Sequence, residues 1–424
     1  MLMLKRFLPL AFIALHFFAP DAHSDEMVSA LLPANTSAGA AFQGSSNGNL
    51  PGSASISKVN VHTLLYPGST TRVLAHYLPW WGPDPRGLDA GYRSDDPQQA
   101  LRTFKDMQSR GVDGLIIDWY GKGNFTDTAW KASMPMLAQV PSLSFSIMID
   151  SGTFKFNAAP GTDLTGTILY HLDYLARTYF PSKQYLRYNG HPVVSEFGME
   201  GVGNADWTRI QQAHPEIYWI HIHAAGLNRP ESTGAFVWVE ASMKAGYGNR
   251  PADLKGLERF YTIAAIQPSK IAIGGAWKGF DDSKAPWAAA SPHYLPQDCG
   301  RTWLDTFKVL NSHYSARQQL PFVQLVTWND YEEGSALESG IASCATIKTQ
   351  VTGRQVSVAL TYPDTVDHLE LYQQITPDSF KVVGRFPADT ATLALPGAQP
   401  ATFYVKAVGK PFMQNVISSA IVVR

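Results

Sequence analysis

The segment DPQQALRTFKDMQSRGVDGLIIDWYG, residues 96–121, joins a helical pattern directly to a strand pattern. The pair Asp96-Pro97 is typical of a helix start and Gly111 of a helix end, and the apolar residues between them recur at helical spacing. The following run VDGLIIDWYG is apolar with little alternation, as expected of a strand that is covered on both faces. The segment therefore predicts one unit of a parallel sheet covered by helices.

The same unit recurs along the chain. Strand-like apolar runs occur at 72–81, 112–121, 143–152, 191–199, 217–226, 234–242, 270–282 and 321–334, and further helical patterns at 126–140, 166–180, 206–215, 253–266 and 301–318. Eight such strands favour a (β/α)8 TIM barrel over an open doubly wound sheet. Pro135 predicts a kink in its helix or a late helix start. The connection at 225–233 shows no clear helical pattern.

The sequence divides into four parts. Residues 1–24 read as a signal peptide, because Lys5 and Arg6 precede a short apolar run and a cut after Ser24 is plausible. Residues 25–70 form a flexible leader rich in Ser and Gly. The predicted barrel spans 71–345. Short alternating runs split by turn residues then predict, for 346–424, an all-β sandwich of immunoglobulin or fibronectin type.

Composition limits the function. The chain of 424 residues is 45% hydrophobic and only 16% charged, with a net charge of -1, so bulk electrostatics attracts neither nucleic acid nor an anionic membrane. No later segment reaches transmembrane length. Cys299 and Cys344 suggest one disulfide in an oxidising compartment, with two separate buried thiols as the alternative. We expect a secreted or periplasmic monomer without a cofactor or stable membrane insertion.

Polar and aromatic side chains follow most of the predicted strands, where parallel barrels carry their active sites. The residues expected to contact a substrate are Tyr77, Trp80, Trp81, Asp118, Tyr120, Asp150, Glu196, His221, His223, Glu240, Trp277 and Trp328. His221 and His223 are two positions apart and thus on one face of a strand. They could bind a metal, but two ligands without a clear third favour hydrogen bonding to a sugar.

The run LVTWNDYEEGSALESGI, residues 325–341, places three carboxylates after the last predicted strand. Hydrolysis of a glycosidic bond generally uses two carboxyl groups, one of which needs a raised pKa to donate a proton. Asp330 and Glu333 are three positions apart, so a turn can point both inward while Glu332 faces elsewhere. We predict that Asp330 and Glu333 are the catalytic pair; the alternative is a solvated acidic loop.

Two of these stretches resemble a known group of enzymes. VLAHYLPWWG with the segment at 95–121, and TWNDYEEGSALESGI, resemble glycoside hydrolase families 71 and 99, the α-1,3-glucanases and endo-α-mannosidases. The resemblance covers about residues 71–345 and implies a base-like role for Asp330 and a general acid at Glu333. Family 99 has Glu where this chain has Asp330. Because family 99 retains and family 71 is thought to invert configuration, the resemblance leaves stereochemistry and the choice of α-mannan or α-glucan open.

Two rival functions remain at this stage. A non-catalytic glycan-binding or polysaccharide-assembly protein on a degenerate barrel would keep the aromatic walls and use the acids only for hydrogen bonds. A metal-dependent hydrolase built on His221 and His223 would lose activity with a chelator. Release of reducing ends from an α-linked oligosaccharide or polysaccharide separates the enzyme from the binding protein.

Overall fold

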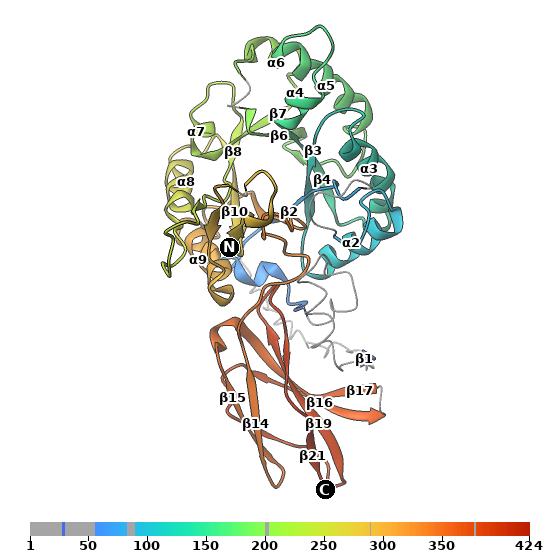
Figure 1. Ribbon diagram of the computed structural model, residues 1–424, viewed down its shortest axis with the longest axis vertical. Coiled ribbons are helices and arrows are strands. Elements are labelled where there is room, and N and C mark those ends of the chain that lie inside the picture. Colours follow the sequence, from blue (N-terminus) through green and yellow to red (C-terminus); the bar gives the residue numbers. More distant parts are fainter. Residues whose placement is uncertain (1–27, 30–55, 83–89, 200–202, 289, 377–378) are drawn as a thin grey trace, which may run out of the picture.

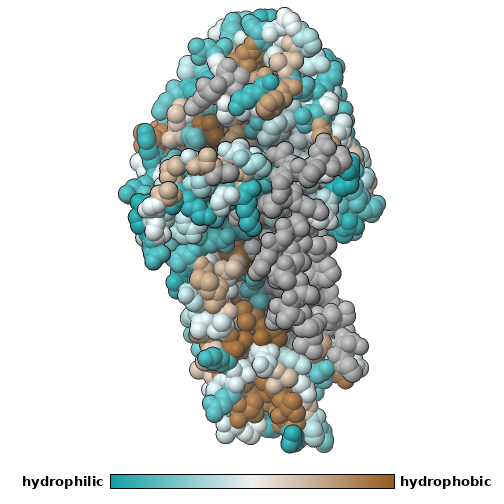
Figure 2. All heavy atoms as spheres, viewed as in Figure 1, coloured by the Kyte–Doolittle hydropathy of each residue, from teal (hydrophilic) through white to brown (hydrophobic). Residues whose placement is uncertain are grey.

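The protein consists of a helix-covered barrel joined to a β-sandwich (Figure 1). A computed structural model describes residues 28–29, 56–82, 90–199, 203–288, 290–376 and 379–424. The predicted signal peptide and most of the predicted leader lie outside these residues. In the space-filling view, hydrophilic residues dominate the surface of the barrel, whereas hydrophobic residues gather over the sandwich (Figure 2).

Eight parallel strands form the barrel. They are β2 (Arg72–Tyr77), β3 (Gly114–Trp119), β4 (Ser144–Asp150), β6 (His191–Phe197), β7 (Tyr218–Ile222), β8 (Gly234–Phe236), β10 (Ile271–Trp277) and β13 (Phe322–Val326). Each pairs with its neighbour in parallel, β13 returns to β2, and the β4–β6 pairing completes the ring. β5 (Arg187–Tyr188) adds an antiparallel edge to β6. The predicted TIM barrel and all eight of its strands are thus confirmed.

Helices follow most of these strands, and the longer ones cover the outside of the ring (Figure 1). They are α2 (Pro97–Ser109), α3 (Phe125–Ser133), α4 (Gly152–Phe156), α5 (Leu164–Thr178), α6 (Trp207–Ala213), α7 (His223–Leu227), α8 (Lys255–Ala265) and α9 (Arg301–His313). Asp96 caps α2 by accepting a hydrogen bond from the backbone N of Gln98. At Pro135 the second helical pattern changes to the 3-10 helix η3 (Met134–Gln139). The weak connection at 225–233 contains only the end of the five-residue α7.

Two antiparallel sheets form the C-terminal part. One contains β14 (Ile347–Thr352), β15 (Gln355–Leu360) and β18 (Thr392–Ala394); the other contains β16 (Val366–Thr376), β17 (Ser379–Pro387), β19 (Ala401–Gly409), β20 (Val416–Ile417) and β21 (Ile421–Val423), with β1 (Val28–Ser29) beside β17. Val356 and Leu393 of the first sheet share one hydrophobic core with Leu369 and Phe403 of the second. The predicted separate all-β unit is therefore present as a two-layer sandwich.

The two parts meet through a loop that leaves the sandwich. Phe412 and Met413 are buried within the hydrophobic core of the barrel. Phe412 lies edge-on to Trp303 of α9, and the Trp303 indole donates a hydrogen bond to the carbonyl of Pro411. Residues 56–70, within the range predicted for the leader, also pack here, with Val61 and Leu65 buried in the same core. Packing on the barrel thus begins before residue 71.

A disulfide joins Cys299 and Cys344, as the cysteine count predicts, across a sequence separation of 45 residues. It ties the start of α9 to the segment that leads into the sandwich. Among the described residues, no helix is both long and apolar enough to cross a membrane.

Replacing both cysteines by serine is expected to lower the free energy of unfolding by about 4 kcal/mol, the chain-entropy value for a loop of this length. Urea denaturation of the double variant and of the wild type measures this loss, and a reductant should lower the stability of the wild type only. Equal stability of the double variant and the oxidised wild type would contradict the prediction.

Candidate active site

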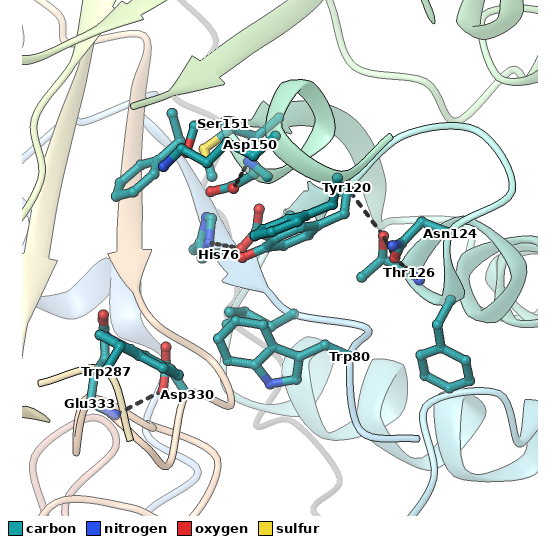
Figure 3. A pocket seen from close by; sticks show the side chains of 18 of the residues that line it. His76, Trp80, Tyr120, Asn124, Thr126, Asp150, Ser151, Trp287, Asp330 and Glu333 are labelled. Atoms are coloured by element: carbon teal, nitrogen blue, oxygen red, sulfur yellow. Dashed lines mark hydrogen bonds and ion pairs between the residues drawn. The ribbon is translucent and has the colours of Figure 1, made fainter. Parts of the chain in front are cut away.

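A pocket of about 750 Å³ opens at the carboxyl ends of the barrel strands (Figure 3). Its lining comes from β2, β3, β4 and β6, from the segments that follow β2, β3, β4, β8 and β13, and from the loop after β11 (Phe280–Asp281). It consists of His76, Leu78, Trp80, Gly82, Asp118, Tyr120, Asn124, Phe125, Thr126, Met148, Asp150, Ser151, Gly152, Lys155, Phe156, Phe197, Trp238, Trp287, Asp330 and Glu333. The structure thus brings six of the fourteen predicted site residues into one pocket: Trp80, Asp118, Tyr120, Asp150, Asp330 and Glu333.

Asp330 and Glu333 lie on a tight turn after β13. The backbone N of Asp330 donates a hydrogen bond to the Thr327 hydroxyl, and the backbone N of Glu333 donates to Oδ1 of Asp330 at 2.9 Å (Figure 3). Gly334 follows with a φ of 61°, a conformation that glycine adopts without strain. The turn points both carboxyl groups into the pocket, while Glu332 is buried and does not line it.

Glu333 sits in an environment that favours its protonated form. Burial of its carboxyl raises the pKa of Glu333 well above the ordinary value, and the negative charges of Asp330, Asp282 and Asp118 act in the same direction. Asp330 is only 2% exposed, and its Oδ1 accepts the hydrogen bond from the backbone N of Glu333. The pair therefore combines a carboxyl that keeps its proton with a second acid three positions away.

A second group of acids faces the pocket from β3 and β4. Burial, followed by the charge of Asp118, raises the pKa of Asp150 to about 8. His76 lies 3.8 Å from Asp118 between Nε2 and Oδ2. Burial lowers the pKa of His76 to about 4, although the charges of Asp330 and Asp150 oppose this shift. Near neutral pH the imidazole is thus uncharged, and Asp150 can donate a hydrogen bond.

Aromatic rings line the bottom and the sides of the pocket. Trp238 packs edge-on against His76, with ring centroids 4.8 Å apart, and against Phe197 at 4.9 Å. Trp80 and Tyr120 lie across the pocket from Glu333 (Figure 3). Gly152, at the start of α4, leaves room for the ring of Tyr120, which a side chain there would strike. Flat rings beside polar groups suit a ligand with both apolar and hydroxylated faces.

Four predicted contact residues support the pocket from behind instead of lining it. Tyr77 is buried on the outer face of β2, where it packs on Phe104 of α2. Trp277 is buried in the core, and Trp328 packs on Phe412. The indole of Trp81 donates a hydrogen bond to the carbonyl of Asn329. Because neighbouring residues of a strand face opposite sides, the inward position in β2 belongs to His76 and not to Tyr77.

The predicted contacts on β6, β7 and β8 also lie off the pocket. Glu196 and His221 are both buried and bind each other, Oε1 to Nδ1, at 3.1 Å. β7 ends at Ile222 and His223 begins α7 with a φ of 60°, so the two histidines do not share one face of a strand, contrary to our expectation. Glu240 is exposed beyond β8. In the described ranges, no group of three or more His, Cys, Asp or Glu side chains is arranged to hold a metal ion.

Several lining residues escaped the sequence analysis. His76, Met148, Phe197 and Trp238 lie at or near strand ends, so the strand-end rule combined with side-chain alternation would find them. Ser151 and Gly152 lie at the end of the predicted run 143–152. Others come from segments with no strand signal: Asn124, Phe125, Thr126, Lys155, Phe156 and Trp287. Trp287 belongs to an excursion with its own small sheet, made of β9 (Ser242–Met243), β11 (Phe280–Asp281) and β12 (His293–Leu295).

A buried polar network holds the turn from below. Arg110, the residue that follows α2, is fully buried and donates hydrogen bonds to the carbonyls of Leu337 and Glu338, each at 3.0 Å. Its guanidinium also pairs with Asp106, one helical turn earlier. The Glu338 carboxyl accepts hydrogen bonds from the hydroxyls of Tyr331 and Tyr92. These contacts fix the chain on both sides of Glu333.

Comparison with known proteins gives matches among solved structures only. No family model matches the chain, and no curated protein matches it. The GH99 endo-alpha-mannosidase from Bacteroides thetaiotaomicron shares 16% identity over 63% of this chain and 87% of its own, with a TM-score of 0.47. Its complex with bis-tris-propane shares 16% identity over 66% of this chain and 89% of its own, with a TM-score of 0.48. A glycoside hydrolase-like protein shares 12% identity over 64% of this chain and 87% of its own, with a TM-score of 0.42. Two of these structures are members of family 99, one of the two families that the sequence motifs resemble.

Proposed function

We propose that the protein is a secreted glycoside hydrolase that cleaves α-linked glycans, either α-mannan or α-glucan. The observation that carries this proposal is the shared position of Asp330 and Glu333 in one pocket lined by aromatic rings, with the pKa of Glu333 raised. The disulfide and the predicted signal peptide support export from the cytoplasm.

In the proposed reaction, Glu333 is the general acid. Its carboxyl keeps a proton because burial and the neighbouring charge of Asp330 disfavour the ionised form. It donates this proton to the glycosidic oxygen as the bond to the anomeric carbon breaks, so that the leaving sugar departs as an alcohol. General acid catalysis of this kind contributes about 10²–10⁴-fold to the rate.

Asp330 acts in this proposal as the base-like carboxylate, which accepts a proton from the hydroxyl that attacks the anomeric carbon, either that of water or the sugar's own 2-hydroxyl. Its position is set by the hydrogen bond from the backbone N of Glu333. The negative charges of Asp330 and Asp118 also stabilise the positive charge that develops on the sugar ring in an oxocarbenium-like transition state. Asp150 and the neutral His76 are suited to hydrogen bonds with sugar hydroxyls, and Trp80 and Tyr120 offer flat surfaces to the ring.

The test is a screen of α-mannans and α-glucans for release of reducing ends by the purified protein, with the anomer of the fresh product read by NMR. Cleavage of either class supports the proposal, and the anomer distinguishes retention from inversion. Binding of an oligosaccharide without any cleavage would overturn it in favour of a glycan-binding protein.

The pH dependence gives a separate prediction. Activity requires protonated Glu333, so kcat/KM should fall as the pH rises through the raised pKa of this group. The charge of Asp118 contributes to that raised pKa. Asp118→Asn should therefore move the basic limb of the residual activity to lower pH, measured as the kcat/KM profile. Asp389→Asn, at an exposed acid of the sandwich, should leave the profile unchanged; an unmoved limb in Asp118→Asn would contradict the assignment.

A further inference from the structure

One exposed indole lines the pocket from a loop that the mechanism above does not use. Trp287 is 58% exposed, whereas the other ten of the 11 tryptophans are buried or half-buried. Removing so large an apolar ring from water is favourable. A ligand that covers the exposed indole at the pocket rim therefore gains binding free energy. Figure 3 shows the indole with Asp330 and Glu333 on one side of the pocket and Trp80 and Tyr120 on the other.

The loop that carries Trp287 is held in place by several contacts. It runs from β11 to β12, and Asp282 closes it by accepting a hydrogen bond from the backbone N of His293 at 2.6 Å. Lys244 of the same excursion binds both carboxylate oxygens of Asp281, at 3.0 and 2.8 Å. A ring on a loop restrained in this way loses little conformational freedom when it binds a ligand.

This loop is also joined directly to the proposed acid. The backbone N of Asp281 donates a hydrogen bond to the carbonyl of Glu333 at 2.8 Å. Trp287 and the carboxyl of Glu333 therefore belong to one connected unit at one side of the pocket. A sugar that stacks on the indole lies next to the group that would protonate the glycosidic oxygen.

We propose that Trp287 forms the binding subsite for the pyranose on the leaving-group side of the cleaved bond, with its indole against the apolar face of that ring. This inference rests on the proposed glycosidase function, because only the role of Glu333 as acid defines which sugar leaves. It makes Trp287 a specificity-determining residue for substrates with at least one sugar beyond the cleaved linkage. A leaving group without a sugar ring gains nothing from it.

Binding can be measured apart from turnover in a Glu333→Gln background. Calorimetric titration with α-mannotetraose and with the α-1,3-glucan tetraose should give a Kd that Trp287→Ala raises about tenfold or more for the sugar that binds. Trp287→Phe should restore most of the affinity, because the flat ring remains. Met243→Ala removes a 46% exposed side chain from the same excursion, outside the pocket, and should leave Kd unchanged.

Turnover then assigns the side of the bond. With Glu333 present, Trp287→Ala should lower kcat/KM about tenfold or more for the tetraose and leave it unchanged for an α-glycosyl fluoride of the same sugar, whose leaving group is fluoride. An equal loss on both substrates, or an unchanged Kd for the tetraose, overturns the inference, while cleavage by the wild type leaves the proposed function intact. Absence of both binding and cleavage for every α-glycan overturns the proposed function itself.

Discussion

Glu333→Gln is expected to lower kcat by about 10²–10⁴-fold, the contribution typical of a general acid. The glutamine has nearly the same shape but no proton to donate to the leaving oxygen. The stability of the variant, in contrast, should be equal to or higher than that of the wild type. Because the folded state holds Glu333 with a raised pKa, the protein loses stability as the pH rises through that pKa, and the uncharged variant does not. Its Tm should therefore match that of the wild type at about pH 4 and exceed it at pH 8.

The two readouts together separate catalysis from folding. Steady-state kinetics on the cleaved glycan and thermal melts at both pH values are needed for Glu333→Gln and for Glu258→Gln, which makes the same chemical change at an exposed residue of α8. The control should keep its activity and its Tm. Full activity in Glu333→Gln would remove this residue from the acid role, and a lower Tm at pH 8 would show that the protein needs its charge for stability.

Arg110→Met is expected to lower the free energy of unfolding by about 3 kcal/mol or more. The guanidinium is buried, and its loss would leave the carbonyls of Leu337 and Glu338 without their donors and Asp106 without one of its cations. The same bonds hold the turn with Asp330 and Glu333, so we also expect a lower kcat in whatever fraction folds. Urea denaturation measures the first effect and kinetics the second.

A surface pair offers the matched control for this charge removal. Arg93 pairs with Asp95 at 2.6 Å, but their side chains are 49% and 32% exposed, so Arg93→Met should lower the free energy of unfolding far less than Arg110→Met. The double variant Asp106→Leu with Arg110→Met should recover part of the loss, because it removes both members of the buried pair. If Arg110→Met is as stable as Arg93→Met, the turn does not depend on α2.

The barrel could be predicted because its signals are local. Apolar strand runs, helix caps and Pro135 each act within a few residues, and all eight strands were found from them. Which side chains line the pocket depends on the face of the strand that each one occupies, and an apolar strand run does not reveal this. Strand-end residues lie on both faces of a strand. The predicted site therefore included Tyr77 and Glu196, which do not line the pocket, and lacked the inward-facing neighbours His76 and Phe197. Only the register of the folded ring separates the two faces.

Other features escaped prediction for lack of any pattern. The strands of the excursion around Trp287 are two or three residues long, too short to show a period. β14 has mostly exposed side chains and no buried face to mark it in the sequence. Asp330 and Glu333 were found because three acids in a chain of low charge stand out, whereas an isolated tryptophan in a loop does not.

The loop at Phe412 has a bearing on how this protein can be dissected. Phe412 and Met413 come from the sandwich, but their side chains are buried in the hydrophobic core of the barrel. A barrel cut free at residue 345 would carry an open apolar socket around Trp303 and Trp328 and would be prone to self-association. The sandwich thus supplies part of the hydrophobic core of the barrel, so we expect the two parts to be stable only when they are expressed as one chain.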